Sequence, residues 1–200
     1  MLSYFYPFLI VIFSVVLTGC SSVLSPVKVG AQHEYLINTV PTVAASRVGH
    51  ATVLVMAPEA GPIYSSKEMV YTTYPYQVAS FANNRWAASP SVMLQSLMVQ
   101  TLQNTHHYRA VVAVPFPGHY DLVLRSELLK LQQDFTRSPS VIRLTLRAQL
   151  INANTNLVVA AKEFTIVERA PRNDPYGGVI AANRAAARLM KQLAVFCEKH

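Results

Sequence analysis

The feature that most constrains the fold is a long stretch of strict alternation in the second half of the chain. In VIRLTLRAQLI, residues 141–151, apolar and polar residues alternate, which places successive side chains on opposite faces of a strand. The apolar face carries Ile142, Leu144, Leu146, Ala148 and Leu150, and the polar face carries Arg143, Thr145, Arg147 and Gln149. NANTN follows as a turn signal, and residues 157–168 return as the partner strand. The pattern predicts a long antiparallel hairpin with one buried face.

Two helices are predicted to pack with these strands. Ser89 and Pro90 supply an N-cap and a first-turn proline for a helix that ends near Asn104. Its apolar residues are Leu94, Leu97, Met98 and Leu102. The second helix is predicted over residues 179–198, after a loop at 169–178. Its apolar face carries Ala182, Ala186, Leu189, Met190, Leu193 and Cys197.

Shorter strands are predicted from the remaining apolar segments. They lie at residues 35–41, 51–58, 108–115 and from 119 onward, with two more within 63–88 on either side of Pro75. The ANN of residues 82–84 is interpreted as a turn. The fold class is therefore α+β (mixed α/β), a single domain with a mostly antiparallel sheet and two main helices packed on it.

The beginning of the chain indicates export. Residues 4–17, YFYPFLIVIFSVVL, are almost wholly apolar, and no charged residue precedes Lys28. This run is shorter than the roughly 20 residues that span a bilayer and matches the apolar region of a signal peptide. It ends at Leu17-Thr18-Gly19-Cys20, which resembles the bacterial lipobox. An uncleaved membrane anchor is the alternative interpretation.

The lipobox resemblance implies cleavage before Cys20 and attachment of diacylglycerol, with fatty acyl chains such as palmitate, to the Cys20 thiol. Ser21 and Ser22 then follow Cys20, which resembles lipoproteins sorted to the outer membrane. The expected organisation is a signal peptide at residues 1–19, a lipidated cysteine with a tether at 20–34, and the domain at 35–200. Cys197, the other cysteine, is expected to pack as a small hydrophobic residue.

Composition and motifs argue against several classes of function. The net charge is +7, but no Lys/Arg-rich run is interleaved with aromatic residues, so nucleic acid is a weaker partner than anionic lipid or an acidic protein. We find no G-x-S-x-G, H-E-x-x-H or metal-ligand spacing. His119 and Asp121 lack a nucleophile with a local signature, and His106-His107 fits a helix terminus. We predict no enzymatic activity, no metal and no cofactor.

Several segments together resemble the ABC-type transport auxiliary lipoproteins, the group that includes the paraquat-inducible protein C lipoproteins. These segments are the lipobox, YLINTVP, VLVMAP, MVYTTYPYQVASFANNRWAASP, YDLVLRSELLKLQQDF and the C-terminal helix. The most specific part is the Tyr71 strand, followed by Arg85-Trp86 and then by Pro90. After that tyrosine the family often has a basic residue, where this chain has Thr72.

The resemblance implies an accessory role in lipid transport between the two membranes of a Gram-negative envelope. The expected partners are an MCE-domain protein with an ABC permease and ATPase, and the expected location is the periplasmic leaflet of the outer membrane. A lipid-binding carrier with an internal pocket is the alternative, and homo-oligomerisation is left open. Tyr71, Tyr74, Arg85 and Trp86 are the candidate partner-binding residues. For Trp86 the core interpretation is favoured over a surface anchor. The aromatic residues Tyr64, Tyr71, Tyr74 and Tyr76 suit a protein contact, a lipid contact or an ordinary strand. Arg143 and Arg147 are interpreted as a solvated strand face, with contact to an acidic protein or to lipid headgroups as the alternative.

Overall fold

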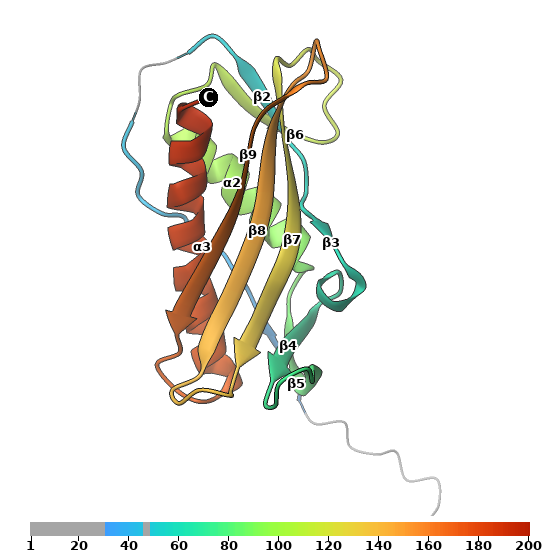
Figure 1. Ribbon diagram of the computed structural model, residues 1–200, viewed down its shortest axis with the longest axis vertical. Coiled ribbons are helices and arrows are strands. Elements are labelled where there is room, and N and C mark those ends of the chain that lie inside the picture. The colour runs from blue at the N-terminus through green and yellow to red at the C-terminus, as the bar shows by residue number, and fades with distance from the viewer. Residues whose placement is uncertain (1–30, 46–48) are drawn as a thin grey trace, which may run out of the picture. The chain divides into compact units, whose positions relative to one another are not determined.

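The computed structural model describes residues 31–45 and 49–200, and Gln32–His200 form one compact unit. The predicted signal peptide, Cys20 and most of the tether lie outside the described residues. Figure 1 shows a sheet with two helices on one side of it. The described elements are β1 His33–Tyr35, β2 Thr52–Val55, β3 Glu59–Ala60, the 3-10 turn η1 Pro62–Tyr64, β4 Glu68–Thr72, β5 Ala79–Trp86, α2 Pro90–Asn104, β6 Ala110–Ala113, β7 Leu122–Asp134, β8 Val141–Asn152, β9 Val158–Arg169 and α3 Pro175–Glu198.

Strand β7 organises the sheet because it pairs along almost its whole length on both sides. On one side it pairs antiparallel with β8, which pairs antiparallel with β9. On the other side β2, β3 and β4 pair with successive parts of β7, all parallel to it. Strand β6 extends the sheet beyond β2, and β5 and β1 extend it beyond β4. The predicted meander β7–β8–β9 is thus confirmed.

The predicted α+β class with two main helices is confirmed, and the sheet is mixed rather than purely antiparallel. The parallel pairings arise because β2, β3 and β4 come from an earlier part of the chain and run in the same direction as β7. Local alternation predicts which side of a strand is buried, but it contains no signal for the direction of a partner 60 or more residues away.

Three local predictions need correction. The strand expected over residues 35–41 ends at Tyr35, because the side chain of Asn183 on α3 binds the next backbone groups instead. It accepts from the Asn38 amide at 3.0 Å and donates to the Leu36 carbonyl at 2.9 Å. The ANN of residues 82–84 lies inside β5. Helix α3 begins at Pro175, within the predicted loop, because Asp174 caps it by accepting from the Gly177 amide at 2.6 Å.

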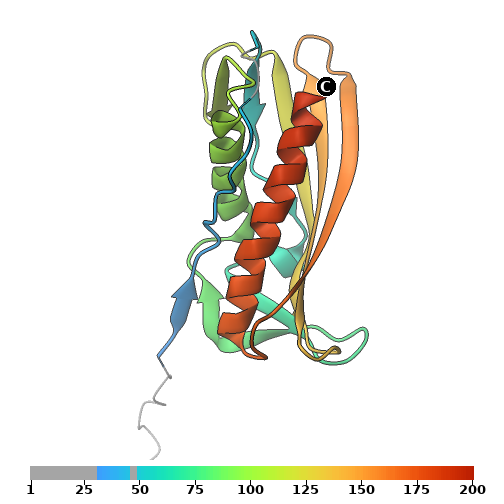
Figure 2. The same ribbon diagram turned by 90° about the vertical axis from the view of Figure 1, so that its left-hand side faces the viewer.

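The core lies between the sheet and the two helices. The predicted apolar face of β8, from Ile142 to Leu150, is at most 3% exposed. In Figure 2 the long helix α3 runs along this layer. Fully buried alanines of α3, such as Ala182 and Ala186, let its backbone approach the strands closely. Each fully buried leucine contributes about 1.5–3 kcal/mol to folding.

The topology places different loops at the two ends of the sheet. At one end, called here the hairpin end, lie the β4–β5 turn, the β7–β8 loop and the β9–α3 loop (Figure 1, lower end). Backbone bonds link these loops, since the Phe135 amide donates to the Thr72 carbonyl and the Ala170 amide to the Ser140 carbonyl, both at 2.8 Å. The β8–β9 turn and the β6–β7 loop lie at the opposite end.

Candidate functional site

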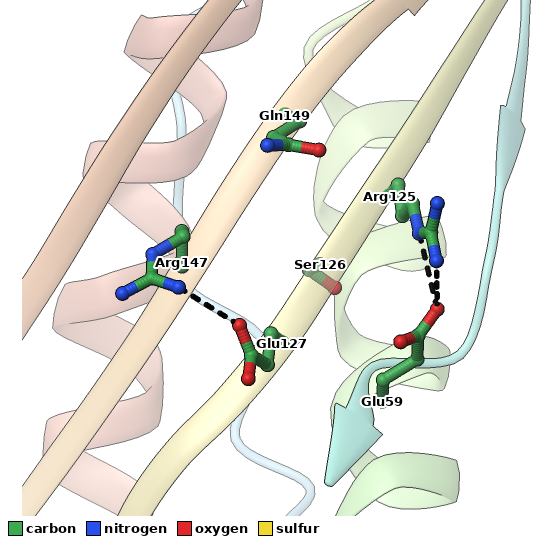
Figure 3. Close-up of a pocket in the computed structure, with 6 residues that line it drawn as sticks. All are labelled: Glu59, Arg125, Ser126, Glu127, Arg147 and Gln149. Atoms are coloured by element: carbon green, nitrogen blue, oxygen red, sulfur yellow. Dashed lines mark hydrogen bonds and ion pairs between the residues drawn. The ribbon is translucent and has the colours of Figure 1, made fainter.

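The open face of the sheet, which neither α2 nor α3 covers, is the first candidate surface (Figure 1). A row of charged side chains crosses it from β3 to β9. Figure 3 shows Arg125 directed toward Glu59, and Arg147 toward Glu127. These residues, with Ser126 and Gln149, line an open depression of about 160 Å³.

The charges of this row are paired with one another, two arginines with three glutamates. Arg147 lies 3.0 Å from Glu127 and 3.3 Å from Glu163, and Arg125 lies 2.6 Å from Glu59. These side chains are about half exposed, and such pairs contribute little stability because water screens them. Arg147 therefore already has carboxylate partners within the chain, so the row is not an unpaired positive patch for an acidic partner, and any surface that meets it has to match charges of both signs.

Arg143 occupies a less exposed position on the same face. It donates to Asp134 at 2.9 Å, and Thr136 donates to the other oxygen of that carboxylate through its amide, also at 2.9 Å. Burial raises the pKa of Asp134, but the hydrogen bonds from Thr136 and Arg143 outweigh it and lower the pKa below its ordinary value. This ion pair ties β7 to β8 next to the hairpin end.

The β4–β5 hairpin is the second candidate surface. Tyr74 is 68% exposed, and Tyr76 is completely exposed in the left-handed backbone region with φ of 66°. Beneath the turn, Tyr71 packs against Phe81 with ring centroids 4.4 Å apart and against the edge of Phe135 at 6.0 Å. The turn thus presents two tyrosines to solvent above an aromatic cluster.

The four predicted partner-binding residues do not form one patch. Tyr71 and Tyr74 belong to the hairpin, whereas Arg85 lies further along β5 and donates to Glu34 on β1 at 2.9 Å. Trp86 is 3% exposed and belongs to the core cluster, so its side chain is not available at the surface. The burial of Trp86 agrees with the core interpretation, and a contact between its side chain and a partner stays a prediction that this burial does not favour.

Sequence reasoning placed the interruption between two strands near Pro75, because a proline between short strands marks their connection, and this agrees with the β4–β5 turn. It missed that Tyr76 is completely exposed at this turn, since exposure depends on the tertiary structure. It also missed Glu59 as the partner of Arg125, which is 66 residues away in the sequence. No local pattern reports a contact at that separation.

The residues considered for catalysis are held in contacts that stabilise the fold or are buried in the core. His119 and Asp121 are 3.7 Å apart, but Asp121 accepts the Thr52 amide at 2.7 Å and so ties the start of β7 to β2. Cys197 is completely buried, which raises its pKa to about 12. Its thiol is protonated at neutral pH and is unsuited to act as a nucleophile. Within residues 31–45 and 49–200, no group of three His, Cys, Asp or Glu side chains could hold a metal ion.

The geometry describes a two-layer domain with an ion-paired open sheet face and an exposed aromatic turn. Comparison with family models identifies it further. Residues 35–194 match the family described as ABC-type transport auxiliary lipoprotein component, and the chain belongs to this family. The family prediction made from the sequence is confirmed. A search of curated proteins gives no match.

Solved structures share the fold. The Xanthomonas campestris protein XCC0632, of family model DUF330, matches with a TM-score of 0.75 and 19% identity over 84% of this chain and 95% of that one. The crystal structure of an uncharacterized protein matches at 0.66 with 14% identity, covering 84% and 99%. The hypothetical protein CT253 from Chlamydia trachomatis matches at 0.51 with 9% identity, covering 75% and 96%. At these identities the likeness concerns the fold.

Membership of this family makes the chain an auxiliary lipoprotein of ABC-type transport, consistent with a place in the cell envelope. Neither α2 nor α3, the helices of the described residues, is long and apolar enough to cross a membrane.

Proposed function

We propose that the protein is a lipid-anchored, non-enzymatic accessory subunit of an MCE/ABC-type system that moves lipids between the two membranes of the envelope. The family match over residues 35–194 carries the proposal. In this proposal residues 1–19 are removed, Cys20 carries the lipid, residues 20–34 join it to the domain, and the anchor lies in the outer membrane facing the periplasm. Transport energy comes from a partner ATPase.

The role of the domain in this proposal is to hold an MCE-domain protein near the membrane. The open sheet face is the surface assigned to that contact. Its charged row alternates in sign across Glu59, Arg125, Glu127, Arg147 and Glu163, as the ion pairs show. Alternating charges give little affinity but fix the register of a complementary surface. Tyr71, Tyr74 and Arg85 stay predictions as contact residues, Arg85 for the partner protein and the two tyrosines for either a protein or a lipid surface.

The test is purification of the tagged protein from detergent-solubilised envelopes, followed by identification of the retained proteins by mass spectrometry. We expect an MCE-domain protein together with its permease and ATPase. Arg147→Glu should reduce that recovery, because it places a third negative charge between Glu127 and Glu163. Lys191→Glu, on an exposed position of α3, is the matched control and should retain the partner.

Two results would contradict the proposal. Extracts in which no MCE-domain protein accompanies the lipoprotein would remove the assigned system. Equal recovery with Arg147→Glu and with wild type would remove the assigned surface. The thermal unfolding of Arg147→Glu should be measured in parallel, because loss of partner in an unfolded variant has no bearing on the contact.

The carrier alternative receives no support from the packing. The space between the helices and the sheet is filled by buried side chains, among them Phe164, Leu146, Leu189 and Met190. Two open surface depressions of about 430 and 420 Å³ are lined mostly by polar and charged residues. A phospholipid chain requires an apolar lining.

A further inference from the structure

At the hairpin end, Tyr74, Tyr76 and Val78 form an exposed tip, and none of their side chains belongs to the core cluster. Tyr76 is completely exposed, Tyr74 is 68% exposed and Val78 is 49% exposed. A non-glycine residue at φ of 66° is in an unfavourable conformation, because its Cβ crowds the backbone. Such a conformation at a fully exposed aromatic residue, with no packing within the domain to repay it, points to a use outside the chain.

The tip is held in place by the residues below it. The hydroxyl of Thr72 lies 2.8 Å from the Tyr74 carbonyl and 2.6 Å from the Gln77 carbonyl, and so closes the turn. The Tyr71, Phe81 and Phe135 rings pack under the turn. The exposed side chains of the tip therefore project from a supported turn.

Positive charge also lies at the hairpin end. Arg137 lies in the β7–β8 loop and Arg169 at the end of β9, both exposed. The bonds from Phe135 to Thr72 and from Ala170 to Ser140 join their loops to the hairpin. Within the described part of the chain, neither arginine has a carboxylate partner, whereas Arg172 in the same region pairs with Asp174 at 3.1 Å.

The described chain also enters at this end. Strand β1 runs parallel to β5, which leads away from the hairpin, so the first residue of β1 points toward the hairpin end (Figure 2). Residues 20 and 32 are 12 positions apart, which an extended chain spans in at most about 40 Å. The 13 residues of β7 alone cover about 40 Å at the usual rise of a strand. A membrane attachment at Cys20 therefore reaches the hairpin end far more readily than the opposite end.

We propose that the hairpin end rests on the anionic phospholipid surface that holds the anchor, with Tyr74, Tyr76 and Val78 at the headgroup level and Arg137 and Arg169 facing the negative charge. This inference rests on the proposed lipid anchor at Cys20. Tyrosine suits the interface because one end of its side chain is apolar and the other is polar. Arginines near an anionic leaflet add an attraction that salt screens.

The experiment places a tryptophan at the tip of the full-length lipoprotein and reconstitutes it into vesicles of phosphatidylethanolamine and phosphatidylglycerol that contain brominated phosphatidylcholine. Bromine quenches tryptophan only at short range. Tyr76→Trp should be quenched strongly. Leu157→Trp, at a similarly exposed position of the β8–β9 turn at the opposite end, should be quenched far less. Trp86 is buried and contributes the same background to both variants.

Charge is tested by adding Arg137→Gln and Arg169→Gln to the Tyr76→Trp protein. We expect the docked fraction relative to the undocked fraction to fall about fivefold for each arginine removed in anionic vesicles. The loss should vanish in vesicles without phosphatidylglycerol, and Lys191→Gln on α3 should change nothing.

Equal quenching at positions 76 and 157 would overturn the proposal. So would Tyr76→Trp emission that responds to an added MCE-domain protein and not to the vesicles, which would assign the tip to a protein partner. The mass of the purified lipoprotein reports the Cys20 lipid separately. A missing anchor, which refutes the proposed function, is thereby distinguished from an anchored domain whose tip stays in water.

Discussion

Replacement of Gly178 by alanine should lower the free energy of unfolding of the domain. The same replacement should raise that free energy when Gln133 is also replaced by alanine. Gly178 lies in the first turn of α3, where a Cβ would overlap Oε1 of Gln133 and lie 2.7 Å from its Cδ. Gln133 is 2% exposed. Its Nε2 donates to Ser140 at 2.9 Å and to the Asp174 carbonyl at 3.1 Å, so it cannot move aside without breaking both bonds.

The magnitude follows from two opposing effects. Alanine is favoured over glycine within a helix by up to about 1 kcal/mol. Forcing an extra methyl group into a packed site costs about 1–3 kcal/mol. Gly178→Ala should therefore lower the free energy of unfolding by up to about 2 kcal/mol in the wild-type background. With Gln133→Ala the site has room, and the same substitution should raise that free energy by up to about 1 kcal/mol.

Urea unfolding provides the assay, because the chain has a single tryptophan, Trp86, whose buried ring reports global unfolding. The four proteins of the cycle are compared, and the coupling between the two sites should be about 1–3 kcal/mol. Gly177→Ala is the control: its Cβ would meet the Arg172 backbone, so Gln133→Ala cannot rescue it. An effect of Gly178→Ala with the same sign in both backgrounds would refute the steric argument.

Three further predictions concern titration and surface charge. Cys197 should resist alkylation by iodoacetamide at pH 8 in the native state and react once urea unfolds the chain, because burial raises its pKa to about 12. The pKa of Asp134 is lower in the folded state than in the unfolded chain, so the ionised carboxylate stabilises the fold. This contribution to the free energy of unfolding is complete above about pH 4 and is lost as the pH falls through the folded-state pKa. Asp134→Asn should therefore make the free energy of unfolding depend less on pH in this acid range. Arg147→Ala should change the free energy of unfolding by less than about 1 kcal/mol, since its ion pairs are half exposed; a larger loss would show that these pairs are structural.

The elements that local periodicity specifies were predicted well. Helix α2 has the predicted bounds, and Leu94, Leu97, Met98 and Leu102 are buried as its spacing requires. The buried face of β8 is the predicted one, and Cys197 packs in the core. The errors fall where a distant group replaces a local signal: Asn183 binds the segment after β1, and β1 pairs with Asn84, the second asparagine of the segment that resembled a turn.

The candidate site was less predictable than the fold. Tyr74 and Tyr76 were singled out as aromatic residues, but their exposure depends on the turn that Thr72 closes. Arg147 was placed correctly on the outward face, yet its pairing depends on Glu127 and Glu163, which belong to two other strands. A single strand's alternation determines the face of a side chain and not its neighbours.

The amino-acid sequence by itself determined the class of the domain, the buried faces of its long elements and the family to which it belongs. These properties follow from local periodicity and from motifs of adjacent residues, because burial of an apolar face is specified within each element. The tertiary structure alone decided that β2, β3 and β4 lie parallel to β7, and that an aromatic turn and two arginines share the end where the described chain enters. Those juxtapositions depend on which packing of distant elements buries the most apolar surface while satisfying the backbone hydrogen bonds. Neither the buried surface nor the hydrogen-bond partners of distant elements can be read from residues that are neighbours in the sequence.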